Sequence, residues 1–137
     1  MKTLRKTDSR CGKHRGIAAV EFAVCLPAVL LLFVGSIECA SMVFLRQTLS
    51  VSAYEGARKA IQFDSTNGDV IANSNNILTS RQVDGASITL NPTDVSAVPT
   101  GTQIGVTVSA PCSSNSVLPL KFFNDYSITV TTTMVKE

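Results

Sequence analysis

The feature that most constrains this chain is an apolar run near its N-terminus, Ile17–Leu45, which reads IAAVEFAVCLPAVLLLFVGSIECASMVFL. The sixteen residues between Glu21 and Glu38 carry no charge, and they make about 24 Å of helix at ~1.5 Å per residue. With its flanks, the run reaches the ~20 residues that a helix needs to cross a bilayer. We therefore predict a transmembrane helix over residues 17–41.

Charge is distributed unevenly about this run. Residues 1–16 contain six basic and one acidic side chain, a net charge of +5, whereas residues 17–137 contain six basic and nine acidic side chains, a net charge of −3. Basic residues beside an apolar segment mark the cytoplasmic side of a membrane span. Binding to nucleic acid is not expected, because residues 1–16 contain no aromatic or base-reading pattern. We expect a single-pass protein whose residues 42–137 lie outside the cytoplasm.

Two other kinds of N-terminal segment fit poorly. A secretory signal peptide would need a shorter apolar core and a small-x-small cleavage site, but the best candidate, Glu38-Cys39-Ala40, has glutamate where a small residue belongs. A lipoprotein would need a small residue before the acylated cysteine, whereas Cys39 follows Glu38 and Cys25 follows Val24. The run is therefore interpreted as a helix that stays in the membrane.

Glu21 lies inside the apolar run and needs a physical explanation. A carboxylate in the apolar layer costs on the order of 2.5–3.5 kcal/mol on insertion scales. No lysine or arginine between Ile17 and Leu45 is available to pair with it. Either the span begins after Glu21, or the carboxylate meets a positive group at the same depth. An α-amino group at Ile17, on this chain or a neighbour, would serve if residues 1–16 were removed.

The residues around Gly16 form a motif that carries an identification. Arg15–Phe22, RGIAAVEF, resembles the prepilin-peptidase site of type IV pilin-like proteins, in which a basic leader ends in glycine. Glutamate is the fifth residue after the cut in that pattern, and an aromatic residue follows. A cut between Gly16 and Ile17 makes Glu21 the fifth residue and Phe22 the aromatic one.

Further residues narrow this resemblance to the TadE-like family of tight-adherence pseudopilins. The blocks that match are Ala19–Ala23, Leu26-Pro27, Gly35–Glu38 and Ala53–Ala60, the last reading AYEGARKA. Together they cover about residues 15–62. Phe22, in place of the tyrosine usual in major pilins, and the long C-terminal region indicate a minor pseudopilin.

This resemblance implies a role in the assembly of a tight-adherence type IVb pilus. The leader, residues 1–16, would be removed by prepilin peptidase in the bacterial inner membrane. The implied partners are that peptidase, other pilins or pseudopilins, the inner-membrane assembly platform and the lipid bilayer. Glu21 would neutralise the Ile17 amine of a neighbouring subunit, with Phe22 beside it. The resemblance leaves open whether the protein enters the pilus or primes its assembly. An anchored binding domain that keeps its leader is the alternative.

Two features of the helix have two readings each. Pro27 is either a harmless kink or a bend that packs the helix into a bundle. Beyond the span, an apolar stripe continues the helix to about Phe63, and it consists of Met42, Leu45, Leu49, Ala53, Ala57 and Ala60. Small residues in this region, Gly56 and Ala57 among them, allow close approach of another element, either as core packing or as a partner surface.

The rest of the chain predicts a small antiparallel sheet, which gives an α+β fold. Asp64–Asn76 is rich in turn residues and is interpreted as a polar loop, with a short helical turn around Val70–Thr79. Alternating patterns predict strands at Ala86–Leu90, Thr102–Ser109 and Tyr126–Val135. The sheet should pack on the second half of the long helix, because neither element buries its apolar face alone. The apolar loop residues expected to cover a sheet edge are Leu118, Leu120, Phe122 and Phe123.

No enzymatic function is expected. The only histidine is His14, in the leader, and the sequence has no tryptophan and no phosphate-binding glycine loop. The four cysteines, Cys11, Cys25, Cys39 and Cys112, lack metal-ligand spacing, so neither a metal nor a cofactor is predicted. Cys25 and Cys39 are interpreted as small apolar residues of the helix. Cys112 is either a free thiol or an intermolecular partner.

Overall fold

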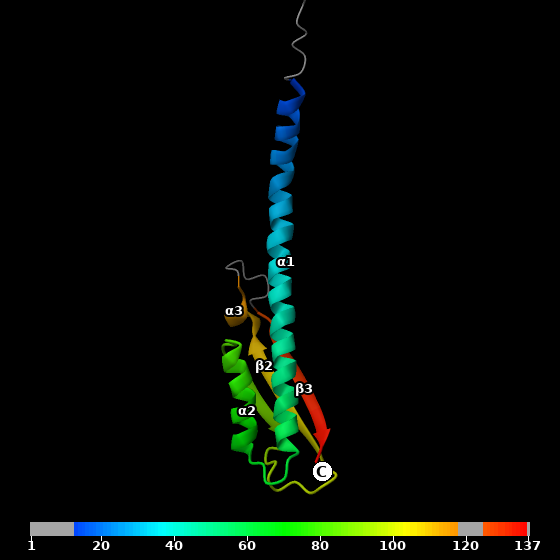
Figure 1. Cartoon of the computed structure of the whole chain (residues 1–137), viewed down its shortest axis with the longest axis vertical. Coiled ribbons are helices and arrows are strands. Elements are labelled where there is room, and N and C mark those ends of the chain that lie inside the picture. Colours follow the sequence, from blue (N-terminus) through cyan, green and yellow to red (C-terminus); the bar gives the residue numbers. More distant parts are fainter. Residues whose placement is uncertain (1–12, 118–124, 137) are drawn as a thin grey trace, which may run out of the picture. The chain divides into compact units, whose positions relative to one another are not determined.

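The computed structural model describes residues 13–117 and 125–136. The chain divides into two compact units, Met1–Ser36 and Ile37–Glu137. Helix α1, Lys13–Ala60, contributes to both units (Figure 1). The predicted long helix is thus confirmed, although it begins before Ile17 and ends at Ala60. Leu118, Leu120, Phe122 and Phe123 lie outside the described residues.

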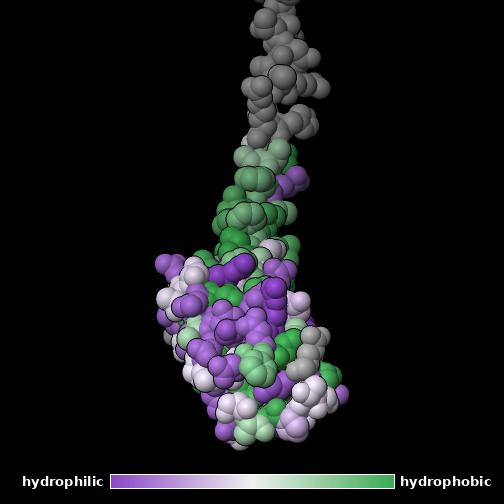
Figure 2. All heavy atoms as spheres, turned by 60° about the horizontal axis from the view of Figure 1, so that its bottom comes forward, coloured by the Kyte–Doolittle hydropathy of each residue, from purple (hydrophilic) through white to green (hydrophobic). Residues whose placement is uncertain are grey.

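The first unit consists of the N-terminal part of α1. Its side chains from residue 17 to 33 are exposed, and hydrophobic residues dominate the visible surface there (Figure 2). Among the described residues, one helix is long and apolar enough to cross a membrane by length and composition. Pro27 lies inside this helix. No acidic residue occupies the first turn of α1, and Arg58 and Lys59 lie in the last turn, where cations interact favourably with the helix dipole.

Helix α2, Asn67–Ser80, occupies most of the segment interpreted as a polar loop. The loop interpretation was wrong for residues 67–76, because Asn67-Gly68 begins a helix instead of forming a turn. The helical turn predicted around Val70–Thr79 lies within α2. Thr66 is the N-cap, and its hydroxyl oxygen accepts a hydrogen bond from the Asp69 amide while the Asp69 carboxylate accepts one from the Thr66 amide. The buried side chains of α2 recur every four residues, at Val70, Ser74 and Leu78.

The second unit contains a three-stranded sheet in the order β1-β2-β3. The strands are β1, Ser87–Asn91, β2, Gln103–Pro111, and β3, Ser127–Val135, and both pairings are antiparallel. All three lie within two residues of the predicted bounds. A four-residue helix, α3, Cys112–Asn115, follows β2 and was not predicted.

The core lies between the second half of α1, α2 and one face of the sheet. The α1 side chains from Leu45 to Ala60 that were expected to form an apolar stripe are buried, and so are Ile104, Val106 and Val108 of β2. Val70 and Leu78 of α2 complete the cluster. The predicted packing of sheet on helix is therefore confirmed.

Candidate functional site

The predicted processing motif lies in the first turns of α1. Gly16, Ile17, Val20 and Glu21 line one shallow hollow on the helix surface, because residues four apart share a helical face. Ile17 and Val20 are 56% and 64% exposed. No other part of the described chain comes within 4 Å of the position that a Cβ of Gly16 would take. The motif is therefore sterically open on this helix.

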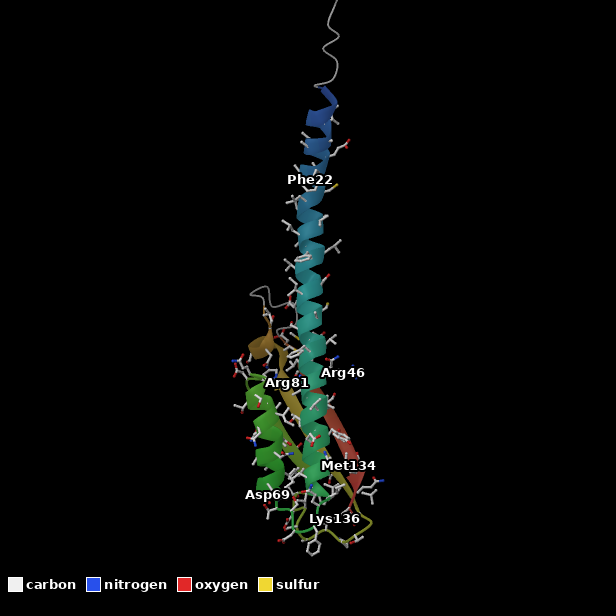
Figure 3. The ribbon with its side chains drawn as sticks, viewed as in Figure 1. Phe22, Arg46, Asp69, Arg81, Met134 and Lys136 are labelled. Atoms are coloured by element: carbon white, nitrogen blue, oxygen red, sulfur yellow. The ribbon has the colours of Figure 1, made fainter. Side chains whose placement is uncertain are left out.

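Glu21 and Phe22 project from adjacent positions of the same helix. Ile17 and Glu21 are one turn apart, so an amine at Ile17 and the Glu21 carboxylate would lie on the same face. Phe22, labelled in Figure 3, is 68% exposed, and as the next residue along the helix it lies about 100° around the axis from Glu21. Within the described part of the chain, no ion pair involves Glu21. This segment thus presents one acidic and one aromatic side chain outward.

Glu38 is placed differently from what a glutamate at the end of a span would suggest. Its side chain is fully buried in the second unit, and the Ser116 hydroxyl donates a hydrogen bond to its Oε1 at 3.4 Å. The Ser41 hydroxyl donates to the Glu38 carbonyl oxygen at 2.7 Å. The contact with Ser116 joins residues 78 positions apart, and no local pattern could have revealed it.

Gly56 and Ala57 lie in the interior, where α1 meets α2. A Cβ added to Gly56 would collide with the Ser74 hydroxyl and lie 3.2 Å from Cγ1 of Val106. The hydroxyl of Ser52 donates to the Ser74 carbonyl oxygen at 3.1 Å, and the hydroxyl of Ser74 donates to the Ser52 carbonyl oxygen at 3.3 Å. Small residues here allow the two helix backbones to exchange hydrogen bonds through serine side chains.

A pocket of about 260 Å³ in the second unit was not anticipated. Its walls include Phe44, Arg81 and Ser114, of which Arg81 is labelled in Figure 3. The Arg81 guanidinium lies 5.7 Å from the centre of the Phe44 ring. This distance is within the range of a cation–π contact. The approach of α1 to the C-terminal end of α2 creates this pair, so only tertiary structure brings the two residues together.

The three described cysteines form no disulfide with one another. Cys25 and Cys39 are exposed on α1, whereas Cys112 is only 2% exposed. Burial raises the pKa of the Cys112 thiol, which favours its neutral form. Cys112 therefore has the surroundings of a structural thiol. Among the described residues, no group of three or more potential metal ligands occurs.

Comparison with known protein families gives a match that covers most of α1. No curated protein and no solved structure matches the chain. A family model described as TadE-like protein matches residues 16–58. The match includes Gly16, Glu21, Phe22, Pro27 and Gly56, and it begins at the residue that precedes the expected cut. Residues 16–58 of this chain therefore form a TadE-like segment, as the resemblance predicted.

Proposed function

We propose that this protein is a membrane-anchored minor pseudopilin that takes part in the assembly of a tight-adherence type IVb pilus. The single observation that carries the proposal is the TadE-like match over residues 16–58. It coincides with the helix that is apolar enough to cross a membrane. A pilus subunit of this kind is stored in the inner membrane, with its C-terminal domain outside the cytoplasm.

The chemical step in this proposal is the cleavage of the leader after Gly16. Prepilin peptidase hydrolyses the Gly16–Ile17 peptide bond, which releases residues 1–16 and leaves an α-amino group on Ile17. The six basic side chains of the leader keep it on the cytoplasmic side until then. Open space around Gly16 supports access of the peptidase to this bond.

The new amine explains the acidic residue in the apolar run. A charged Glu21 is costly in lipid unless it is paired, and the segment contains no lysine or arginine that could pair with it. The Ile17 amine of a neighbouring subunit provides the missing charge. Such a pair aligns adjacent helices at one depth, and Phe22 contributes apolar contact beside it. Other pilins or pseudopilins and the assembly platform are the partners in this step.

The test is to determine the N-terminal sequence and intact mass of the protein from membranes, with and without prepilin peptidase. We expect the mature chain to begin at Ile17 only when the peptidase is present. A leader that is intact in both strains would contradict the proposal and leave a membrane-anchored binding domain. Cleavage near Ala40 would instead indicate a secreted protein.

A pair of glycine variants serves as the control. Gly16 and Gly35 both lie in α1, and no other part of the described chain comes within 4 Å of a Cβ added to either of them. Gly16→Leu and Gly35→Leu therefore add the same side chain to open positions of one helix. We expect Gly16→Leu to block release of the leader and Gly35→Leu to leave it unaffected.

A further inference from the structure

The sheet has a long edge with no partner among the described residues. β2 is the central strand, so β1 and β3 are both edge strands. β3 pairs with β2 along all nine of its residues, in continuous register. Within residues 13–117 and 125–136, no backbone hydrogen bond reaches the other side of β3. An open edge of this kind is a template for another strand.

The hydrogen-bond register identifies which groups of β3 point outward. The Lys136 amide donates to the Thr102 carbonyl oxygen, and the Cys112 amide donates to the Tyr126 carbonyl oxygen, both at 2.9 Å. Bonded pairs alternate along an antiparallel ladder, so the even-numbered residues of β3 bond to β2. The residues whose N–H and C=O groups point outward are therefore Ser127, Thr129, Thr131, Thr133 and Val135.

The β3 sequence itself lacks the features that usually prevent strand pairing. Natural edge strands carry charged side chains, proline or bulges, are short, or are covered by a helix or loop. β3 reads SITVTTTMV, which contains neither a charge nor a proline, and it is nine residues long. The five outward-bonding residues are exposed, and four of them are serine or threonine, whose side chains have a hydroxyl as their only polar group.

The other edge of the sheet matches β3 in direction. β1 and β3 are each antiparallel to β2, so they run parallel to one another. The same alternation leaves the backbone groups of Ile88 and Leu90 pointing outward from β1. The β1 sequence SITLN is also uncharged. A second copy in the same orientation can therefore bring its β1 edge beside β3 as a parallel pair.

Within the sheet unit, β3 runs in the same direction as the part of α1 that belongs to that unit (Figure 1). Two sheet units in the same orientation therefore have parallel β1 and β3 edges. Antiparallel pairing of β3 with the β3 of a second copy would instead require one sheet unit to be inverted relative to the other.

We propose that the outer edge of β3 binds the β1 edge of a second copy of this chain, so that the sheet continues from one subunit to the next. This inference rests on the proposed membrane anchorage, which confines the copies to one layer. The contact joins two different edges, so it repeats from subunit to subunit and forms rows or rings. Five residues of β1 give a weak contact in solution, and confinement to the membrane raises the effective concentration of the edges.

Cysteine cross-linking of the full chain in membranes tests this arrangement. Thr89 aligns with Thr107, and Thr107 aligns with Thr131, so Thr89 and Thr131 lie two strand spacings apart, about 10 Å. That exceeds the ~7 Å limit between Cα atoms for a disulfide within one chain. The variant Thr89→Cys/Thr131→Cys can therefore be cross-linked only between copies. Double variants that combine Thr89→Cys with Thr129→Cys or Thr133→Cys test other registers of the pairing.

The background for this experiment carries Cys11→Ala, Cys25→Ala and Cys39→Ala, and it keeps Cys112, which is only 2% exposed. With a copper-phenanthroline oxidant, we expect at least one double variant to form a ladder of covalent multimers, about tenfold more abundant than in the single variants. Equal cross-linking by Thr131→Cys alone, or cross-linking of Thr131→Cys to a different protein, would overturn the proposal. A ladder no stronger than that of Thr107→Cys on the central strand would also overturn it.

A matched pair of lysine variants separates edge pairing from loss of fold. The hydroxyls of Thr107 and Thr131 share one hydrogen bond of 2.8 Å. Thr131→Lys and Thr107→Lys in the cross-linking background both break that bond and add the same charge to the same face. For this arm the cysteine pair is Thr89→Cys/Thr129→Cys or Thr89→Cys/Thr133→Cys, whichever gives the stronger ladder. Thr131→Lys should reduce the amount of covalent multimers about tenfold, whereas Thr107→Lys should leave that amount unchanged. Equal effects of the two lysines would contradict edge pairing.

The same membranes report separately on the proposed function. The N-terminus of each sample shows whether residues 1–16 have been removed. A ladder from chains with an intact leader would uphold edge pairing while contradicting the pseudopilin role. Cleaved chains without a ladder would do the reverse.

Discussion

The close approach of α1 to α2 depends on Gly56, which has no side chain. Ser74 occupies the space that a Cβ would need, and its hydroxyl already donates to the Ser52 carbonyl oxygen. Val106 of the central strand closes the other side. An alanine at position 56 must therefore displace a buried, hydrogen-bonded serine.

Gly56→Ala is expected to lower the free energy of unfolding by about 1–3 kcal/mol, the usual cost of overpacking a filled core. Thermal unfolding of the full chain in detergent measures the change. Gly68→Ala is the matched control, because its Cβ would meet only the Thr66 hydroxyl at 3.7 Å. That control should leave stability unchanged or raise it by up to about 1 kcal/mol. Equal effects of the two substitutions would disprove the steric explanation.

A substitution of Glu21 tests the proposed role of this residue in assembly. Glu21→Ala removes a charge from the apolar run, so insertion into the membrane should persist or improve. Pilus assembly should fall about tenfold or more if the carboxylate pairs with the Ile17 amine of a neighbour. Counting pili by electron microscopy, with the amount of membrane protein measured in parallel, checks both expectations. Glu55→Ala on the same helix is the control, and normal pilus numbers in Glu21→Ala would remove this role.

At the scale of elements, α2 shows why local patterns were insufficient. Its segment contains four Asn, two Ser and one Gly, which disfavour helix interiors, and Asn-Gly is a strong turn signal. The capping box at Thr66 and Asp69 and the burial of Val70, Ser74 and Leu78 against other elements override those preferences. The spacing of these residues was a usable signal, but composition obscured it.

The C-terminal end of α2 gives a prediction about its stability. Gln82 has φ of 55°, a left-handed conformation that usually requires glycine, and its amide donates to the Thr79 carbonyl oxygen. Gln82→Gly should raise the free energy of unfolding by about 1 kcal/mol, because a side chain is strained in this region. Ser80→Gly, inside the last helical turn, should lower it by about 0.5–1 kcal/mol. Denaturant unfolding in detergent measures both, and a loss of stability in Gln82→Gly would contradict the strain argument.

For the whole molecule, two carboxylates predict how stability depends on pH. Hydrogen bonds from the Thr66 hydroxyl and amide lower the pKa of Asp69, and those from the Ser96 hydroxyl and amide lower the pKa of Asp94. Because each pKa is lower in the folded chain, the unfolded chain binds protons more readily as the pH falls. Their stabilising contribution is therefore complete above the ordinary value of 3.8 and is lost as the pH falls through the lower folded values.

We expect the melting temperature to fall below about pH 4, and the double variant Asp69→Asn/Asp94→Asn to show a shallower fall. Circular dichroism of the full chain in detergent between pH 7 and about pH 2 measures the profile. Asp84→Asn controls for the loss of one surface charge. An unchanged slope in the double variant would show that these hydrogen bonds do not set the acid response.

Local periodicity was enough to predict the transmembrane helix and the strands from the sequence. An uncharged run of sixteen residues can satisfy its backbone in lipid only as a helix, and the alternation of Ile104, Val106 and Val108 predicts a strand with one buried face. The motif from Gly16 to Phe22 is contiguous, so it could also be recognised from the sequence. Its functional role depends on other proteins and stays a proposal.

Tertiary structure alone decided the contacts between residues distant in sequence. The burial of Glu38 beside Ser116, the pairing of Arg81 with Phe44 and the position of β3 at an edge of the sheet all result from the order in which the elements pack. Hydrophobic periodicity specifies which face of a strand or helix is buried, but not which partner covers it. That choice follows from burial and hydrogen bonding summed over the whole unit, which a local pattern does not contain.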